Sequence, residues 1–467
     1  MNLKPGAHIH LMGICGTAMG SLAGLLQVQG FKVTGSDTSP YPPMSTQLEK
    51  LGIPIMIGYK PENLKPKPDF VIVGNVVSAN NPEAQEVNRL GIPFTSLPKA
   101  MGEFIIQDRH CVCISGTHGK TTTTSVAAWM FDQLGLNPGF LIGGVPKNFD
   151  LSFRIPTGNY FIIEGDEYDT AYFDKVPKFI HYKPRSVILT SVEFDHADIY
   201  KDLDDVKSAF KRLLKLVPDD GVFIYWAEDA NIKDILKSHQ PKQIRSYGLN
   251  EGDYQAKNSR EENGFTVFDV QFKGENLGTF RSGLSGSYNV LNCLSLITLA
   301  HFHGFNLEKV KRALESFEGV KRRQEIRGEP GGRLLIEDFA HHPTAVKKTV
   351  EGIIKRYPGR RVFSIFEPRS ATSRRKIFQR EYVEAFLTSS EIILAEPFDQ
   401  SKITETDRFS TQELKADLEA KGKRAHCFQK AAEIVDFLKS ESKPGDILLV
   451  MSNGGFDGIY EKILKGL

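Results

Sequence analysis

The fold is decided by the segment Ser115-Gly-Thr-His-Gly-Lys-Thr-Thr-Thr123. The apolar run 111–115 before it predicts a buried strand, and residues 121–134 after it predict a helix that ends at Gly135. A glycine-rich loop between a strand and a helix presents backbone N–H groups to phosphate oxygens, and a lysine at its end reaches the outer phosphates. The segment therefore predicts a phosphate-binding loop (P-loop) in an α/β sheet.

Each part of this P-loop offers a different interaction. Lys120 is predicted to bind the β- and γ-phosphates, and the Thr121 hydroxyl is predicted to hold Mg²⁺. The common form of the loop has a glycine where this chain has Ile114, so this is a shortened variant. The nucleotide-binding candidates in the loop are Gly116, Thr117, His118, Gly119, Lys120, Thr121 and Thr122.

Two later strand-like runs end in acidic residues. Residues 160–163 lead to Glu164, and residues 187–192 lead to the segment Glu193-Phe-Asp-His-Ala-Asp198. Parallel strands place their carboxyl ends at one edge of a sheet, so we expect both acidic segments near the P-loop. His196 either binds a second metal ion or is a hydrogen-bonded loop histidine, and the P-loop favours the metal. The predicted catalytic residues are Lys120, Glu164 and His196, and the predicted metal ligands are Thr121, Glu164 and His196.

The first forty residues predict a second turn of the same kind, with a weaker signal. A strand over 8–12, a turn Gly13-Ile-Cys-Gly-Thr-Ala-Met-Gly20 and a helix over 18–29 precede a strand that leads to Asp37. Glycines there allow the backbone to approach a diphosphate, and an acid after the next strand can accept ribose or base hydrogens. The spacing departs from GxGxxG, which leaves a plain tight turn as the alternative. The candidate residues are Gly13, Cys15, Gly16, Thr17 and Asp37.

Composition sets limits on the class of protein. The chain has 467 residues, of which 40% are hydrophobic and 25% charged, so several ordinary globular cores are expected rather than one small binding module. Its formal net charge of +2 is too small to produce a long-range electrostatic attraction for nucleic acid or an anionic membrane. Five cysteines without metal-site spacing indicate reduced thiols and a cytoplasmic enzyme. Six glycines interrupt the charge-free stretch 5–31, which is therefore not interpreted as a signal peptide or membrane span.

Apolar strand-like runs alternate with helical patterns nearly throughout, which predicts α/β layers with mainly parallel sheets. We expect three domains: an N-terminal Rossmann-like domain over 1–105, a central P-loop ATPase domain over 106–327 and a C-terminal Rossmann-like domain over 328–467. The second boundary rests on the Gly/Pro cluster of residues 327–332.

Taken together, these motifs resemble the Mur ligase family. The resemblance is carried in order by residues 116–124, 164–167, 195–198, 286–292, 321–323 and 338–343. It implies an ATP-dependent amide-forming enzyme of peptidoglycan synthesis in a bacterial cytoplasm, with ATP and Mg²⁺ as cofactors. It also implies a UDP-sugar site in the first domain, at the turn already described.

Further stretches resemble the branch of this family that acts in peptidoglycan recycling. That branch joins UDP-N-acetylmuramate to the tripeptide L-alanyl-γ-D-glutamyl-meso-diaminopimelate, and the alternative is the sister branch that adds L-alanine alone. The stretches are residues 166–175, 179–185, 193–198, 366–370 and 451–456. The sister branch is expected to have a sequence richer in histidine and arginine at residues 366–370.

The resemblance implies several further site residues. Those matching ATP contacts are Asn289, Asn292, Arg323 and Asp338, and the last two are expected to reach the nucleotide when the domains close. Those expected to bind the peptide are Arg369, Tyr168 and His341. Tyr288 stands where many members have histidine, which leaves the contact with the base open. Lys211 has the spacing of a lysine that is carbamylated in some sister ligases but generally not in this branch.

The sequence allows alternative interpretations of two histidines and of the overall function. His341 and His342 either accept the proton of the attacking amine or begin a helix at Pro343. Two rival functions are also possible: an NAD-dependent oxidoreductase would use the first turn but not the P-loop, and a nucleotide switch would use the P-loop but not the first turn.

Overall fold

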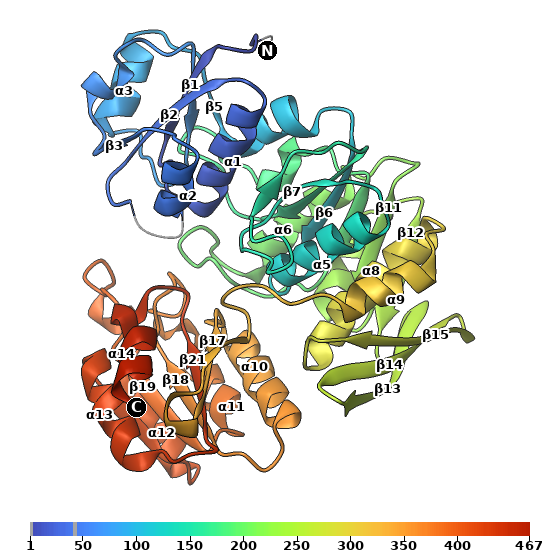
Figure 1. The fold of residues 1–467 in the computed structure, drawn as a ribbon, viewed down its shortest axis with the longest axis vertical. Coiled ribbons are helices and arrows are strands. Elements are labelled where there is room, and N and C mark those ends of the chain that lie inside the picture. The colour runs from blue at the N-terminus through green and yellow to red at the C-terminus, as the bar shows by residue number, and fades with distance from the viewer. Residues whose placement is uncertain (1–2, 41–43) are drawn as a thin grey trace.

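Figure 1 shows the computed structural model, which describes residues 3–40 and 44–467. Three α/β regions follow one another along the chain, each built on its own sheet. The N-terminal region (blue) lies at one end of the molecule, the C-terminal region (orange to red) at the other, and the central region (cyan to yellow) beside them. The predicted fold class is therefore confirmed.

In the described part of the N-terminal region, parallel strands form a sheet in the order β3-β2-β1-β4-β5. The strands are β1 (His8–Met12), β2 (Lys32–Asp37), β3 (Ile55–Ile57), β4 (Phe70–Val73) and β5 (Phe94–Ser96). The helices are α1 (Thr17–Val28), α2 (Met44–Lys50), α3 (Pro82–Arg89) and α4 (Leu97–Ala100). The strand order reverses between β1 and β4, and in open α/β sheets the crevice beyond such strand ends binds ligands.

The central region has a mixed sheet in the order β15-β14-β13-β12-β11-β10-β6-β9-β7-β8. The strands are β6 (His110–Ser115), β7 (Gly139–Leu141), β8 (Phe153–Arg154), β9 (Tyr160–Gly165), β10 (Ser186–Leu189), β11 (Val222–Trp226), β12 (Ile244–Gly248), β13 (Tyr254–Glu262), β14 (Phe265–Phe272) and β15 (Glu275–Ser282). The helices are α5 (Lys120–Gln133), α6 (Leu203–Leu214), α7 (Ala230–Leu236), α8 (Ser287–Phe302) and α9 (Leu307–Glu315).

Two features of this sheet differ from the sequence prediction. Strands β13, β14 and β15 pair antiparallel, whereas the alternating pattern predicted mainly parallel pairing. The strand predicted over 187–192 ends at Leu189. Thr190 and Ser191 leave the sheet because they pass against Gly116, and Val192 N–H donates to the Asp229 carboxylate at 2.8 Å.

The C-terminal sheet has the order β16-β17-β21-β18-β19-β20, with β16 antiparallel to β17 and the other pairs parallel. The strands are β16 (Glu325–Gly328), β17 (Leu334–Asp338), β18 (Val362–Phe366), β19 (Glu391–Ala395), β20 (Ala425–Phe428) and β21 (Ile447–Met451). The helices are α10 (Pro343–Arg356), α11 (Glu381–Phe386), α12 (Thr411–Ala420), α13 (Ala431–Glu441) and α14 (Ile459–Gly466).

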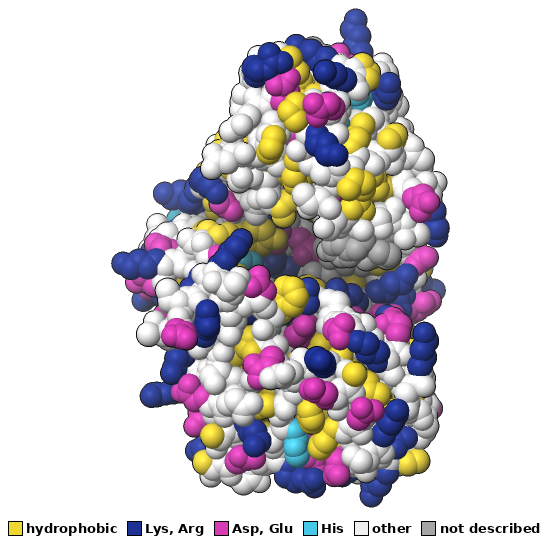
Figure 2. Space-filling view, turned by 90° about the vertical axis from the view of Figure 1, so that its left-hand side faces the viewer, with side chains coloured by type: hydrophobic (Ala, Val, Ile, Leu, Met, Phe, Trp, Pro, Cys, Tyr) yellow, Lys and Arg dark blue, Asp and Glu magenta, His cyan; other side chains and the backbone are white. Residues whose placement is uncertain are grey.

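One hydrophobic cluster spans the N-terminal and central regions, each of which also has a cluster of its own, while the C-terminal region has separate clusters. One cluster of buried side chains includes Leu22 of α1 together with Phe161 of β9 and Phe210 of α6. Two other clusters cover the faces of the C-terminal sheet. Figure 2 shows a hollow between the N-terminal part at the top and the C-terminal part at the bottom. Within the described residues, no helix combines the length and the apolar character that a membrane crossing requires.

Candidate active site at the phosphate-binding loop

The P-loop has the predicted context, between β6 and α5. Gly116 and Gly119 have φ values of +127° and +83°, which side chains rarely adopt. A Cβ at Gly116 would lie 2.3 Å from Thr190 Oγ1, and one at Gly119 would lie 2.7 Å from Asn292 Oδ1. The chain therefore needs glycine at both positions, both for the turn and for the close approach of neighbouring segments.

The loop amides divide into two groups. Thr117 N–H donates to Ser191 O at 2.9 Å, and His118 N–H donates to Ser191 Oγ at 3.1 Å. The first N–H groups of α5 have no acceptor inside their own helix and point out from its N-terminus, as in anion-binding sites. The amides at the start of α5, beside Lys120 and Thr121, are thus the better placed for a phosphate.

Lys120 lies inside a carboxylate cluster. Its Nζ donates to Gly116 O at 2.5 Å and contacts Glu167 Oε2 at 3.1 Å, and the Glu167 side chain is 2% exposed. Burial alone would lower the pKa of Lys120, but the charges of Glu167 and Asp166 raise it above its usual value. Lys120 therefore stays charged and is available to bind a phosphate. The sequence motif over residues 164–167 does not indicate that Glu167 pairs with Lys120.

Thr121 and Glu164 meet as the sequence predicted. Thr121 Oγ1 donates to Glu164 Oε2 at 3.0 Å, and Gly143 N–H donates to Glu164 Oε1 at 2.6 Å. Burial and the nearby charge of Asp166 raise the pKa of Glu164. A partly buried carboxylate next to a hydroxyl oxygen offers the oxygen ligands that Mg²⁺ prefers. These residues fit a magnesium ion.

His196 takes a different place from the other two predicted metal ligands. Its Nε2 lies 3.6 Å from Glu167 Oε1, and its ring lies 4.6 Å from the ring of Tyr168. Its φ of +54° is in the left-handed region, which is uncommon outside glycine. The geometry therefore pairs His196 with Glu167, while Thr121 pairs with Glu164.

Asn289 and Asn292 are buried on α8 and face the P-loop. Asn292 Nδ2 donates to Asn289 Oδ1 at 3.1 Å, and Asn289 Nδ2 donates to Ser285 O at 2.7 Å. The closeness of Asn292 to Gly119 places this pair beside the loop. Tyr288 is hydrogen-bonded by the side-chain amide of Gln324.

Arg323 and Asp338 have different surroundings. Arg323 Nη2 lies 3.4 Å from Thr121 Oγ1, and its guanidinium stacks 4.5 Å from the centre of the Phe339 ring. Asp338 accepts backbone N–H groups from Gln324 at 2.9 Å and Ala340 at 2.8 Å. Arg323 thus already reaches the P-loop, while Asp338 holds the segment that carries Arg323.

Contacts between the central and C-terminal regions gather on the segment after β10. Thr344 Oγ1 donates to Glu193 Oε2 at 2.6 Å, and Thr372 Oγ1 donates to Asp195 Oδ1 at 2.7 Å. His342 is the N-cap of α10, where its Nδ1 accepts Thr344 N–H, and this matches the helix-start alternative. These cross-region partners were missed because residues 151 and 177 positions apart give no sequence signal for their contact.

The first glycine turn also brings its predicted residues together. Gly13, with φ +79°, begins the turn after β1, and Thr17 begins α1. Cys15 N–H donates to Asp37 Oδ2 at 2.9 Å, and Gly16 is the N-cap of α1. A Cβ at Gly13 would lie 3.1 Å from Val76, which follows β4. The turn therefore lies at the crevice between β1 and β4.

The residues predicted to bind peptide come from two regions. Arg369 lies after β18, where its guanidinium is 3.7 Å from the centre of the Phe398 ring and 3.3 Å from Glu367 Oε1. His341 is partly buried, with its Nδ1 3.0 Å from Phe339 O. Tyr168 belongs to the central region, and its hydroxyl donates to Asp166 Oδ2 at 2.8 Å. Among the described residues, no hydrogen bond or ion pair joins Tyr168 to Arg369 or His341.

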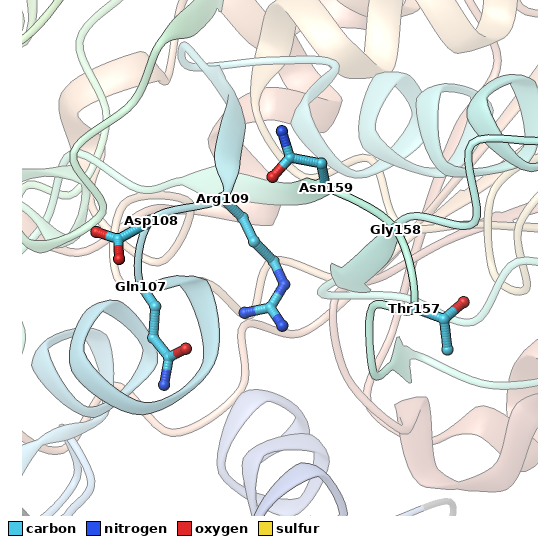
Figure 3. Close-up of a pocket in the computed structure, with 6 residues that line it drawn as sticks. All are labelled: Gln107, Asp108, Arg109, Thr157, Gly158 and Asn159. Carbon is cyan, nitrogen blue, oxygen red and sulfur yellow. The ribbon is translucent and has the colours of Figure 1, made fainter.

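A surface pocket of about 430 Å³ lies at the opposite edge of the central sheet (Figure 3). Its lining residues are Gln107, Asp108, Arg109, Thr157, Gly158 and Asn159. They precede β6 and β9, whereas the P-loop follows β6, and Figure 3 shows Arg109 extending between the two segments. The pocket is therefore remote from the candidate active site.

Comparison with known families covers nearly the whole chain. Residues 8–109 match the domain described as "Mur ligase family, catalytic domain", and residues 114–300 match the "Mur ligase middle domain". Residues 322–454 match the "Mur ligase, glutamate ligase domain".

Individual relatives align over almost their full length. The UDP-N-acetylmuramate–L-alanyl-γ-D-glutamyl-meso-2,6-diaminoheptandioate ligase of Escherichia coli K12 is 39% identical over 460 residues, which is 98% of each chain. The UDP-N-acetylmuramate–L-alanine ligase of Clostridium tetani is 34% identical over 99% of each chain. The crystal structure of a murein peptide ligase from Psychrobacter arcticus matches with a TM-score of 0.75 and 35% identity, covering 99% of this chain and 98% of that one.

Proposed function

The chain belongs to the Mur ligase family, and on this premise we propose that it is an ATP-dependent ligase that acts on UDP-N-acetylmuramate and a murein tripeptide. The bond formed is an amide between the lactyl carboxylate of the sugar and the amine of L-alanyl-γ-D-glutamyl-meso-diaminopimelate. The observation that carries the proposal is the P-loop centre, where Lys120, Thr121, Glu164 and Arg323 converge. The full-length likeness to the ligase of Escherichia coli supports the choice of substrates.

The proposed reaction has two steps. The lactyl carboxylate attacks the γ-phosphorus of ATP, which gives an acyl phosphate and releases ADP. The tripeptide amine then attacks the acyl carbon, the amide forms, and phosphate leaves with one oxygen from the carboxylate. Activation is needed because a carboxylate oxygen is otherwise a poor leaving group.

Lys120 and Arg323 are the cationic residues for the first step. Both carboxylate and ATP are anionic, so positive charge held in a buried site lowers the barrier to phosphoryl transfer. Thr121 and Glu164 would hold Mg²⁺, and His196 beside Glu167 would contribute to a second metal position. Bound Mg²⁺ supplies further neutralisation of the phosphate charge.

The three ligands are assigned to the three regions. Residues 1–105 bind the UDP-sugar through Gly13, Cys15, Gly16, Thr17 and Asp37, and residues 106–327 bind ATP. Residues 328–467 bind the tripeptide, with Arg369 offering its planar guanidinium to a carboxylate. His341, which is partly buried and follows Asp338 closely in the chain, is the candidate acceptor of the amine proton. ATP and UDP-sugars are cytoplasmic metabolites, and the five free cysteines agree with a cytoplasmic location.

The second candidate is the ligase that adds L-alanine alone, which the Clostridium tetani relative favours. One assay decides between the two. Phosphate release from ATP is measured with UDP-N-acetylmuramate and either the tripeptide or L-alanine as acceptor. We expect turnover with the tripeptide at a kcat/KM at least tenfold above that with L-alanine. Preference for L-alanine would establish the second candidate, and acceptor-independent hydrolysis would refute both.

A further inference from the structure

Three side chains from separate segments meet where the P-loop contacts the C-terminal region. They are His118 of the P-loop, Glu193 after β10 and His342 at the N-cap of α10. One ligand atom of each lies within 4.8 Å of the other two. His118 Nε2 is 3.3 Å from Glu193 Oε2, and His342 Nδ1 is 3.6 Å from the same oxygen.

These separations match a tetrahedral metal site. Zinc binds imidazole nitrogen and carboxylate oxygen at about 2.0–2.2 Å, which places neighbouring ligand atoms about 3.3–3.5 Å apart in a tetrahedron. Two imidazoles and one carboxylate, with a fourth position for water, are a donor set suited to zinc. Mg²⁺ prefers oxygen ligands alone, so this cluster selects a different class of cation from Thr121 and Glu164.

The surrounding hydrogen bonds already orient two of the ligands. Thr344 Oγ1 donates to Glu193 Oε2 at 2.6 Å, which fixes the carboxylate. His342 Nε2 lies 3.2 Å from Phe194 O, and donation to this carbonyl leaves the lone pair on Nδ1, facing Glu193. The Thr344 N–H that Nδ1 accepts is at 3.3 Å, a long hydrogen bond that a metal can replace. Protein metal sites commonly have such outer hydrogen bonds to their histidine and carboxylate ligands.

We propose that His118, Glu193 and His342 form a binding site for a divalent transition-metal ion of the Zn²⁺ class, distinct from the magnesium position. The ion joins the central and C-terminal regions, because Glu193 and His118 belong to one and His342 to the other. His118 lies inside the P-loop, so the bound ion also holds the nucleotide loop against α10.

The test measures Zn²⁺ binding to the full chain by competition with a chromogenic chelator, with Mg²⁺ in excess. His342→Asn removes a ligand but keeps a good helix N-cap, so the start of α10 is preserved. We expect one Zn²⁺ per chain in the unmodified protein and affinity weakened by more than about 100-fold in H342N. The matched control is His239→Asn, which changes an exposed histidine away from the cluster and leaves the affinity as it was.

A milder variant and a spectrum keep the test informative if H342N folds poorly. Thr344→Val removes the hydrogen bond to Glu193 and is expected to weaken Zn²⁺ binding by about tenfold. Co²⁺ bound in place of Zn²⁺ is expected to give the intense visible bands of a tetrahedral site, and H342N to abolish them. Equal Zn²⁺ affinity in H342N and H239N, or only the weak bands of octahedral Co²⁺, would overturn the proposal and leave the cluster as a hydrogen-bonded contact between regions. Binding is measured without substrates, so this outcome is separate from that of the ligase assay.

Discussion

Two turns of the same design, Gly13–Gly16 after β1 and Gly116–Gly119 after β6, have different electrostatic surroundings. Both follow a parallel strand, and both begin with a glycine of positive φ. The P-loop is surrounded by buried charges, whereas the acidic residue beside the first turn, Asp37, already accepts the Cys15 N–H of that turn. We therefore expect the same backbone geometry to hold a diphosphate in one place and to support a reaction in the other. The difference is made by the residues at the ends of neighbouring strands.

The largest expected effect is at the P-loop. Lys120→Ala removes the cation proposed to bind the transferred phosphoryl group, and we expect kcat to fall by about 10²- to 10³-fold or more. The measurement is phosphate release at saturating UDP-N-acetylmuramate and tripeptide. Lys233→Ala, at a surface ion pair with Glu251, is the matched control and should keep full activity. A decrease in kcat of less than tenfold in the Lys120 variant would contradict a catalytic role for the P-loop that the first turn lacks.

Arg369 belongs to neither turn, so its effect should fall on the third ligand. Arg369→Ala is expected to raise the KM for the tripeptide by about tenfold or more, because a charged hydrogen bond contributes about 1.5–3 kcal/mol. Arg369→Lys keeps the charge but loses the planar fork, and should give an intermediate value. Arg424→Ala, at an exposed arginine of the same region, serves as control. Equal increases in the KM for ATP and for the tripeptide would remove Arg369 from the peptide site.

The first turn should affect binding rather than chemistry. Gly13→Ala places a side chain at φ +79° and 3.1 Å from Val76, and we expect the KM for UDP-N-acetylmuramate to rise about tenfold. The KM for ATP and kcat should change less than about twofold. Gly52→Ala introduces similar backbone strain at φ +66° with open space around it, and so controls for loss of stability. A kcat loss specific to Gly13→Ala would show that this turn participates in the reaction.

The smallest expected effect is on pH-dependent stability at the junction that contains the P-loop. Burial, reinforced by the charge of His118, lowers the pKa of His342 to about 3, so the folded protein keeps this ring neutral. The unfolded chain binds a proton there below pH about 6.5, so stability is lost as pH falls from 6.5 towards 3, by up to about 1.4 kcal/mol per pH unit.

Urea unfolding at pH 7, 6 and 5 checks this expectation. His342→Asn should flatten the decline of the unfolding midpoint with falling pH, while His239→Asn should follow the unmodified protein. A parallel decline in all three proteins would show that His342 is not the group that titrates.

Much of the fold follows from local sequence signals. Strand β1 has the predicted bounds because Ile9, Leu11 and Met12 are fully buried in a parallel strand that ends before Gly13. The antiparallel strands β13 to β15 were not predicted because half of their surface is solvated and their pattern is less distinct. The early end of β10 depends on packing against Gly116, which only the folded chain shows.

The contacts of the site that follow from neighbouring strands could be predicted from the sequence, whereas those that depend on how the regions dock could not. Thr121 and Glu164 lie together because β6, which leads into the P-loop, and β9, which carries Glu164, are neighbours in one sheet. The contact of Glu193 with Thr344 and His342 depends on how the C-terminal region docks on the central one, and no spacing in the sequence encodes that arrangement. Glu167 belongs to the motif over residues 164–167. Its contact with Lys120, rather than with the proposed metal ligands, depends on distances that only the folded protein shows.

The central claim is that the P-loop centre phosphorylates the carboxylate of the sugar bound at the first turn. Its most direct test uses UDP-N-acetylmuramate with ¹⁸O in the lactyl carboxylate, together with ATP and the tripeptide. Mass analysis of the released phosphate should find one ¹⁸O atom per phosphate, because the acyl phosphate keeps a carboxylate oxygen bound to phosphorus when the amide forms. Phosphate without ¹⁸O, formed at the same rate as the amide, would contradict the claim.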